Sequence, residues 1–113
     1  AVQEQPANVP HGTLVGVTGL YQGAQITLKN GEMIRLGRSS ENDLIFADQM
    51  HVSRQHCQIT WDEAKGQYKI YDTSSTGSYM NGQEEPLPQN MEVWLGTGVT
   101  LDIGDSTNRF SLE

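Results

Sequence analysis

Three short polar segments of this chain carry the side chains best suited to binding an anion. They are Gly37–Ser40 (GRSS), Ser53–His56 (SRQH) and Ser75–Gly82 (STGSYMNG). Each follows or precedes an apolar stretch, so each is expected to be a loop at a strand end. An arginine fork beside several hydroxyl groups is the donor set that a phosphate group requires, because phosphate combines high charge with three strong acceptor oxygens.

The composition narrows the classes of partner. The chain has 113 residues, with 14 acidic and 7 basic side chains and a net charge of −7. This balance argues against nucleic acid as a partner, because nucleic-acid-binding surfaces are normally basic. Between Arg35 and Lys65 the only bases are Arg38 and Arg54. A single phosphate group can still be bound where these two cations come together.

The cysteine count and the lengths of the apolar runs bear on the cellular location of the chain. The single cysteine, Cys57, excludes an internal disulfide and fits a reducing compartment. No apolar run is long enough for a membrane span, and no signal segment opens the chain. We therefore expect a cytoplasmic location without direct membrane insertion. Because the first residue is Ala rather than Met, we also expect a piece of a larger polypeptide.

Short stretches of alternating apolar and polar residues dominate the chain after residue 11. The expected strands are 13–18, 24–28, 33–36, 43–46, 56–61, 67–72, 78–81, 92–95, 99–103 and 109–112. Gly, Asn and Asp separate them, and Asn30-Gly31 predicts a β-hairpin turn. The pattern predicts an all-β fold, a β-sandwich of about eleven short, mostly antiparallel strands. Residues 1–11, with two prolines and no periodicity, are expected to be a linker or disordered tail before one domain at 12–113.

The three polar segments, in this order and spacing, resemble the forkhead-associated (FHA) domain family. The hallmarks are a Gly-Arg pair, a Ser-x-x-His motif and a downstream Asn-Gly preceded by a Ser/Thr/Gly loop. The ending is similar too, with Leu95–Val99 (LGTGV), Leu101–Gly104 (LDIG) and a final Phe110. The resemblance covers about Gly12 to Glu113. It implies a β-sandwich that binds phosphothreonine-containing proteins or peptides, a signalling interaction module rather than an enzyme, with no cofactor.

The resemblance also implies a role for each matched residue. The phosphopeptide-binding candidates are Arg38, Ser53, Arg54, Ser75, Thr76 and Asn81. Gly37, His56 and Gly82 are expected to support these loops structurally. Thr76 stands where the family usually has an Asn, and a threonine hydroxyl lacks the paired donor and acceptor of an amide. His51 is either an exposed loop residue or a reader of the peptide beyond the phosphothreonine.

Three other functions can be compared with phosphopeptide binding: assembly, hydrolysis and metal binding. A phospho-independent assembly or dimerisation domain would use the same scaffold and dock a partner through a sheet face. A hydrolase built on Ser53 and His56 lacks an obvious orienting acid and oxyanion loop. Metal binding is not expected, because the histidines and the cysteine show no ligand spacing beyond His51 and His56.

Overall fold

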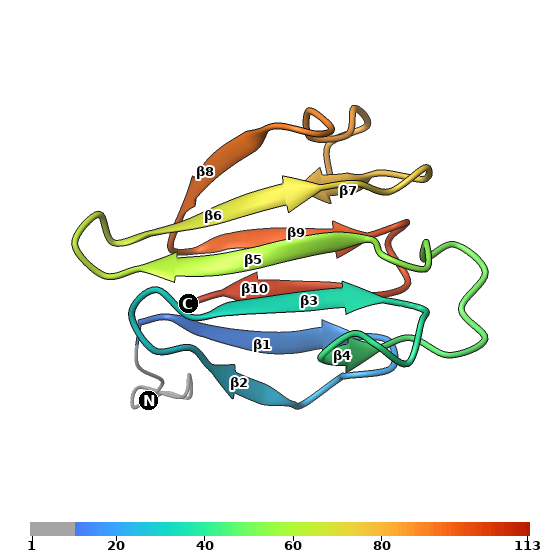
Figure 1. Cartoon of the computed structure of the whole chain (residues 1–113), viewed down its shortest axis with the longest axis horizontal. Coiled ribbons are helices and arrows are strands. Elements are labelled where there is room, and N and C mark those ends of the chain that lie inside the picture. The colour runs from blue at the N-terminus through green and yellow to red at the C-terminus, as the bar shows by residue number, and fades with distance from the viewer. Residues whose placement is uncertain (1–10) are drawn as a thin grey trace, which may run out of the picture.

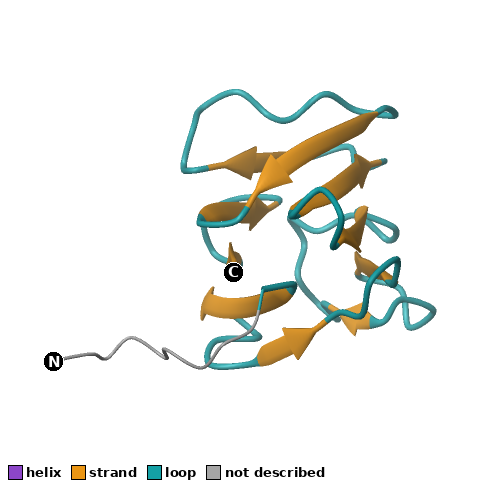
Figure 2. Ribbon diagram, turned by 90° about the vertical axis from the view of Figure 1, so that its left-hand side faces the viewer, coloured by secondary structure: helices purple, strands orange, loops and turns teal. Residues whose placement is uncertain are grey.

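The computed structural model describes residues 11–113, and these residues form ten β-strands and no helix (Figure 1; Figure 2). The strands are β1 (Thr13–Thr18), β2 (Gln25–Thr27), β3 (Met33–Gly37), β4 (Leu44–Ile45), β5 (Cys57–Asp62), β6 (Gln67–Asp72), β7 (Ser78–Met80), β8 (Glu92–Gly96), β9 (Val99–Ile103) and β10 (Arg109–Leu112). The all-β prediction is confirmed. The predicted tail at 1–11 lies, apart from His11, outside the described residues.

The strands form two five-stranded sheets. One has the order β2-β1-β10-β9-β7 and the other the order β4-β3-β5-β6-β8. All pairs are antiparallel except β3 with β4, which run parallel. Within the part of the chain described, no helix is long and apolar enough to cross a membrane.

Strict alternation along the central strands produces the core between the sheets. In β5 the buried residues are Cys57, Ile59 and Trp61, and in β6 they are Tyr68, Ile70 and Asp72. Successive side chains of a strand point to opposite faces, so every second residue enters the core. The rings of Phe46 and Phe110 pack edge to face, with their centroids 6.2 Å apart. The Tyr21 ring lies 5.2 Å from Phe46 and 6.2 Å from Phe110. The core thus joins the two sheets into one scaffold that carries the loops.

The Asn30-Gly31 turn has a different role from the predicted hairpin. The turn itself forms, since the Glu32 amide donates to the Lys29 carbonyl at 2.9 Å and Gly31 has a φ of 81°. However, β2 pairs with β1 whereas β3 pairs with β5, so the turn links the two sheets. The Asn30 side chain accepts from the Glu63 amide at 2.9 Å. Tertiary contacts of this kind override the local hairpin preference.

Candidate functional site

Three loops meet at one end of the sandwich, on the right of Figure 1. They follow β3, precede β5 and follow β6. Because β5 runs antiparallel to both β3 and β6, the end of β3, the start of β5 and the end of β6 lie side by side. Strand pairing therefore brings the loops that carry Arg38, Ser53 and Ser75 to the same end of the sandwich.

Backbone hydrogen bonds hold the first loop against the second. The Arg38 amide donates to the Ser53 carbonyl at 2.9 Å, and the Ser39 amide donates to the Arg54 carbonyl at 3.1 Å. The buried Asn42 side chain donates to the carbonyls of Ser39 and Arg54, at 2.9 and 2.7 Å. The backbone that carries Arg38 is thus fixed, while its guanidinium stays accessible.

Gly37 is required by the close approach of these two loops. A Cβ atom at this position would lie 2.2 Å from the Arg54 carbonyl oxygen and 2.7 Å from Asn42 Nδ2. Real Cβ atoms are not found at such distances from backbone oxygens, so any larger residue would push the loops apart. The structural support predicted for Gly37 therefore has a steric basis in the structure.

The hydroxyl of Ser53 lies against the third loop. It accepts a hydrogen bond from the Ser75 amide at 3.0 Å, and the two hydroxyl oxygens are 3.2 Å apart. Ser53 is half-buried and Ser75 is exposed. The Ser75 amide is engaged with Ser53, so the two hydroxyl groups are the side-chain donors that this pair offers to an anion.

His56 supports the second and third loops from beneath. Its Nδ1 accepts from the Ser53 amide at 3.1 Å, and its Nε2 donates to the Gly77 carbonyl at 2.8 Å. These partners specify the neutral Nε2–H tautomer, because an amide can only donate and a carbonyl can only accept. Burial lowers the pKa of His56, although the Gly77 carbonyl and Asp72 oppose the shift. Since both ring nitrogens are engaged by backbone groups, neither is free to accept a proton from the Ser53 hydroxyl.

A buried carboxylate shapes the start of the third loop. Asp72 Oδ1 accepts from both the amide and the hydroxyl of Ser74, at 2.7 and 2.6 Å. The same hydroxyl accepts from the Gly77 amide at 2.8 Å, and Gln89 donates to the Ser74 carbonyl at 2.7 Å. This chain of hydrogen bonds presents Ser75 and Thr76 outward.

Thr76 joins the second and third loops. Its hydroxyl donates to the His51 carbonyl at 2.7 Å, and its own carbonyl accepts from the Tyr79 hydroxyl at 2.9 Å. The hydroxyl proton is committed to His51, so only the oxygen lone pairs of Thr76 are free to meet a ligand. His51 has an exposed side chain whose Nε2 lies 3.6 Å from Asp105 Oδ2.

The remaining predicted residues are less closely connected to this set. Arg54 follows Ser53 in the second loop, and it is exposed. Asn81 and Gly82, with φ of 54° and 69°, form a tight turn after β7. The Asn81 side chain accepts from the Thr100 amide at 3.0 Å. Its hydrogen bonds within residues 11–113 thus go to the neighbouring strand, and a contact between Asn81 and a peptide stays a prediction.

Sequence reasoning missed several residues that build the site. Asn42, Ser74 and Gln89 hold the loops through the bonds described above, and Met50 lies beside Arg38, with its Sδ 3.9 Å from Nη1. Buried polar residues such as Asn42 and Ser74 are unusual in a small core, but their burial is not readable from the sequence. Only the burial of Asp72 could have been predicted, because Asp72 occupies a core position in the alternating pattern of its strand.

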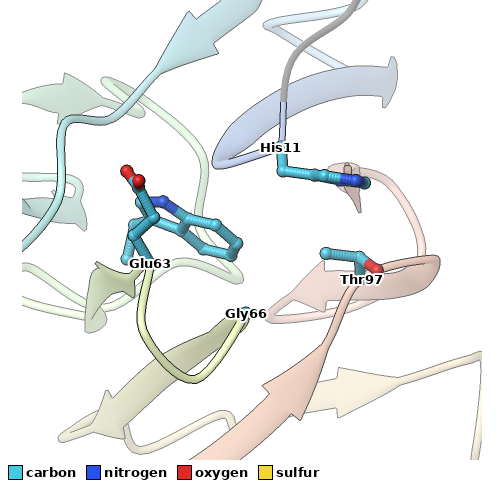
Figure 3. Close-up of a pocket in the computed structure, with 5 residues that line it drawn as sticks. His11, Glu63, Gly66 and Thr97 are labelled. Atoms are coloured by element: carbon cyan, nitrogen blue, oxygen red, sulfur yellow. The ribbon is translucent and has the colours of Figure 1, made fainter.

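A separate hollow of about 450 Å³ lies at the opposite end of the sandwich, where β5 turns into β6. Figure 3 shows His11, Glu63, Gly66 and Thr97 around it, and Trp61 also lines it. It contains none of the three polar segments. Across residues 11–113, no group of three or more His, Cys, Asp or Glu side chains is placed to hold a metal ion.

Comparison with known proteins decides the family. The family model described as the FHA domain matches residues 34–104, which include the loops that carry Arg38, Ser53 and Ser75. The chain belongs to the FHA domain family. This FHA domain is 33% identical over 99 residues to the E3 ubiquitin-protein ligase CHFR of Homo sapiens, covering 88% of this chain and 15% of that protein. The chain thus spans only a small part of the curated relatives it matches.

Solved structures agree on the fold of this FHA domain. The FHA domain of a hypothetical protein from Arabidopsis thaliana is 26% identical, with a TM-score of 0.72, and the match covers 97% of this chain and 92% of that one. A structure described as a study of phosphothreonine-dependent FHA domain interactions is 25% identical, with a TM-score of 0.63 and coverage of 88% and 91%. A FhaA FHA domain, also 25% identical, has a TM-score of 0.65 and coverage of 88% and 96%, and is complexed with the intracellular domain of Rv3910.

Proposed function

We propose that this FHA domain binds phosphothreonine-containing peptides through the three loops and is not itself an enzyme. The observation that carries the proposal is the convergence of Arg38, Ser53 and Ser75 at one end of the sandwich. The Arg38 amide donates to the Ser53 carbonyl at 2.9 Å, and the Ser75 amide donates to the Ser53 hydroxyl at 3.0 Å. The family membership and the phosphothreonine-dependent interactions described for a relative support it.

The role of each side chain follows from the hydrogen-bond donors that it carries. The Arg38 guanidinium supplies a planar fork that can bond two phosphate oxygens and offset their charge. The Ser53 hydroxyl and the Ser75 hydroxyl supply short, directed donors. Each charge-assisted hydrogen bond contributes about 1.5–3 kcal/mol, so the set supports binding at roughly micromolar Kd.

The hydrogen bonds between the loops preorganise this site for a ligand. Little loop ordering remains to be done on binding, because His56, Asn42 and Thr76 already tie the three loops together. Preorganisation of this kind raises affinity by reducing the entropy lost on association. We propose further that residues 12–113 act as one interaction module of a larger signalling protein in the cytoplasm.

An oriented phosphothreonine peptide library, followed by calorimetric titration of the best peptide, tests the proposal. We expect binding that disappears on dephosphorylation of the peptide and in Arg38→Ala. Arg35→Ala is the matched control, since Arg35 lies on β3 and pairs with Asp43 at 3.6 Å. Equal binding of phosphorylated and unphosphorylated peptides would instead indicate the phospho-independent assembly function.

A further inference from the structure

Met50 is an unusually exposed apolar side chain in the loop that carries Ser53. It is 76% exposed, the highest value among the large hydrophobic side chains of residues 11–113. Packing in the core therefore does not explain a methionine at this position. A thioether this accessible can be reached by oxidants in solution.

The sulfur of Met50 is in contact with the cation of the proposed phosphate site. Arg38 Nη1 donates toward Met50 Sδ across 3.9 Å. A thioether is only a weak acceptor, so a phosphate group displaces this contact easily. The contact does place any group attached to the sulfur beside the guanidinium.

We propose that Met50 is an oxidative modification site, and that its sulfoxide weakens phosphopeptide binding by occupying Arg38. The predicted loss of phosphopeptide binding rests on the proposed function. The predicted contact between the sulfoxide and Arg38 is independent of it. The oxidant is a peroxide, which gives one oxygen atom to the sulfur and leaves as water or an alcohol. The sulfur loses two electrons to the peroxide, and a sulfoxide reductase with a thiol reductant reverses the step.

The chemical consequence follows from the change in acceptor strength. Oxidation converts an apolar side chain into a polar one that bears an S=O group. The new oxygen is a much better acceptor than the thioether sulfur, and it forms within reach of Arg38 Nη1. A phosphate group must then compete for donors that are already engaged. We expect about a tenfold loss of affinity, the effect of losing roughly one hydrogen bond to a charged group.

Other sulfur atoms of the chain provide internal controls. Met33 and Met91 are 46% and 54% exposed, but Met33 lies on β3 and Met91 directly precedes β8, so neither is in the loop that carries Ser53. Cys57 is buried, and burial raises the pKa of its thiol, so it reacts slowly. Oxidation at Met33 or Met91 is expected to leave phosphopeptide binding unchanged.

The experiment treats the protein with hydrogen peroxide and locates the oxidised methionine by mass spectrometry. Binding of a phosphothreonine peptide is then titrated before and after treatment, in wild type, Met50→Leu and Met91→Leu. Each protein is compared with its own untreated state. We expect wild type and Met91→Leu to lose affinity and to recover it with methionine sulfoxide reductase, whereas Met50→Leu does not respond.

A second readout needs no peptide. The NMR signal of the Arg38 guanidinium should shift when Met50 is oxidised and return after reduction. Equal losses in wild type and Met50→Leu, or no loss in wild type, would overturn the inference while leaving the proposed function standing. Absence of binding by the untreated protein would overturn the proposed function instead, and an unmoved Arg38 signal would then still refute the Met50 contact.

Discussion

The hydroxyl of Thr76 donates a hydrogen bond to the carbonyl oxygen of His51 across 2.7 Å. This bond joins the loop before β5 to the loop after β6, at the position where the family usually has an asparagine. The chain thus uses this side chain to tie its loops together. The bond leaves the hydroxyl oxygen of Thr76 able to accept, but not to donate, a hydrogen bond to a peptide.

Removing this hydroxyl should lower stability slightly and weaken binding. In Thr76→Val the loops lose an exposed hydrogen bond that contributes at most about 1 kcal/mol to stability, so the melting temperature should fall by only a few degrees. The freed loops must then be ordered when the peptide binds, and an ordering cost of about 1 kcal/mol lowers affinity roughly fivefold. Calorimetric titration with one phosphopeptide checks this, and Thr76→Ser should restore binding. Wild-type affinity in Thr76→Val would show that the tie between the loops is unimportant.

Ser53→Ala should reduce phosphopeptide affinity more than Ser75→Ala does. Both variants lose a hydroxyl that can face the phosphate, but Ser53→Ala also leaves the Ser75 amide without its acceptor at 3.0 Å. We expect a loss of about 10- to 100-fold for Ser53→Ala, the effect of one charge-assisted hydrogen bond. Titrations of both variants against the same peptide give the ranking, and the reverse order would contradict the assigned geometry.

Stability should fall as the pH drops below about 6.5, because His56 is buried in its neutral form. The folded-state pKa lies below the ordinary value of 6.5, so the unfolded chain binds a proton first. The stability present above pH 6.5 is therefore lost progressively as the pH falls toward the lowered folded-state pKa. Urea unfolding at pH 7.5 and pH 5.5 measures the change in the free energy of unfolding.

The control for this pH effect is His56→Gln, which keeps polar atoms but does not titrate. It should be less stable at pH 7.5, because a flexible glutamine side chain loses more rotamer freedom than an imidazole ring when it is fixed between Ser53 and Gly77. Its stability should depend less on pH in this range than that of wild type. An equal dependence in both proteins would assign the effect to other groups.

Gly37→Ala should destabilise the domain by about 1–3 kcal/mol, the usual cost of overpacking. The added methyl group would lie 2.2 Å from the Arg54 carbonyl oxygen, which is backbone and cannot rotate away. Gly96→Ala is the matched control, since a Cβ there meets no atom within 4 Å. Thermal unfolding of both variants tests this, and similar melting temperatures would show that the two loops can separate without cost.

Much of the fold was readable from the sequence. The strands β1, β6, β9 and β10 have the predicted limits, because strict alternation and flanking turn residues set both their period and their ends. The turn at Asn30-Gly31 was also predicted, since a residue free to adopt positive φ is needed there. Local chemistry decides features of this kind.

The sequence by itself also determined which side chains are available to bind an anion. Arg38, Ser53 and Ser75 stand at strand ends, and antiparallel pairing of β5 with β3 and β6 brings such ends together. Their clustering therefore follows from chain order once the strands are known. Their roles in binding remain a proposal that the variants above test.

Only the tertiary structure decided how the loops are held. The link between β2 and β3 crosses from one sheet to the other, which no local pattern distinguishes from a hairpin. The bonds of Asn42, Ser74 and Thr76 join residues distant in the sequence or depend on burial. The contact between Arg38 and Met50 likewise depends on how two loops pack. Residue type limits what a side chain can donate or accept, but packing selects the partner.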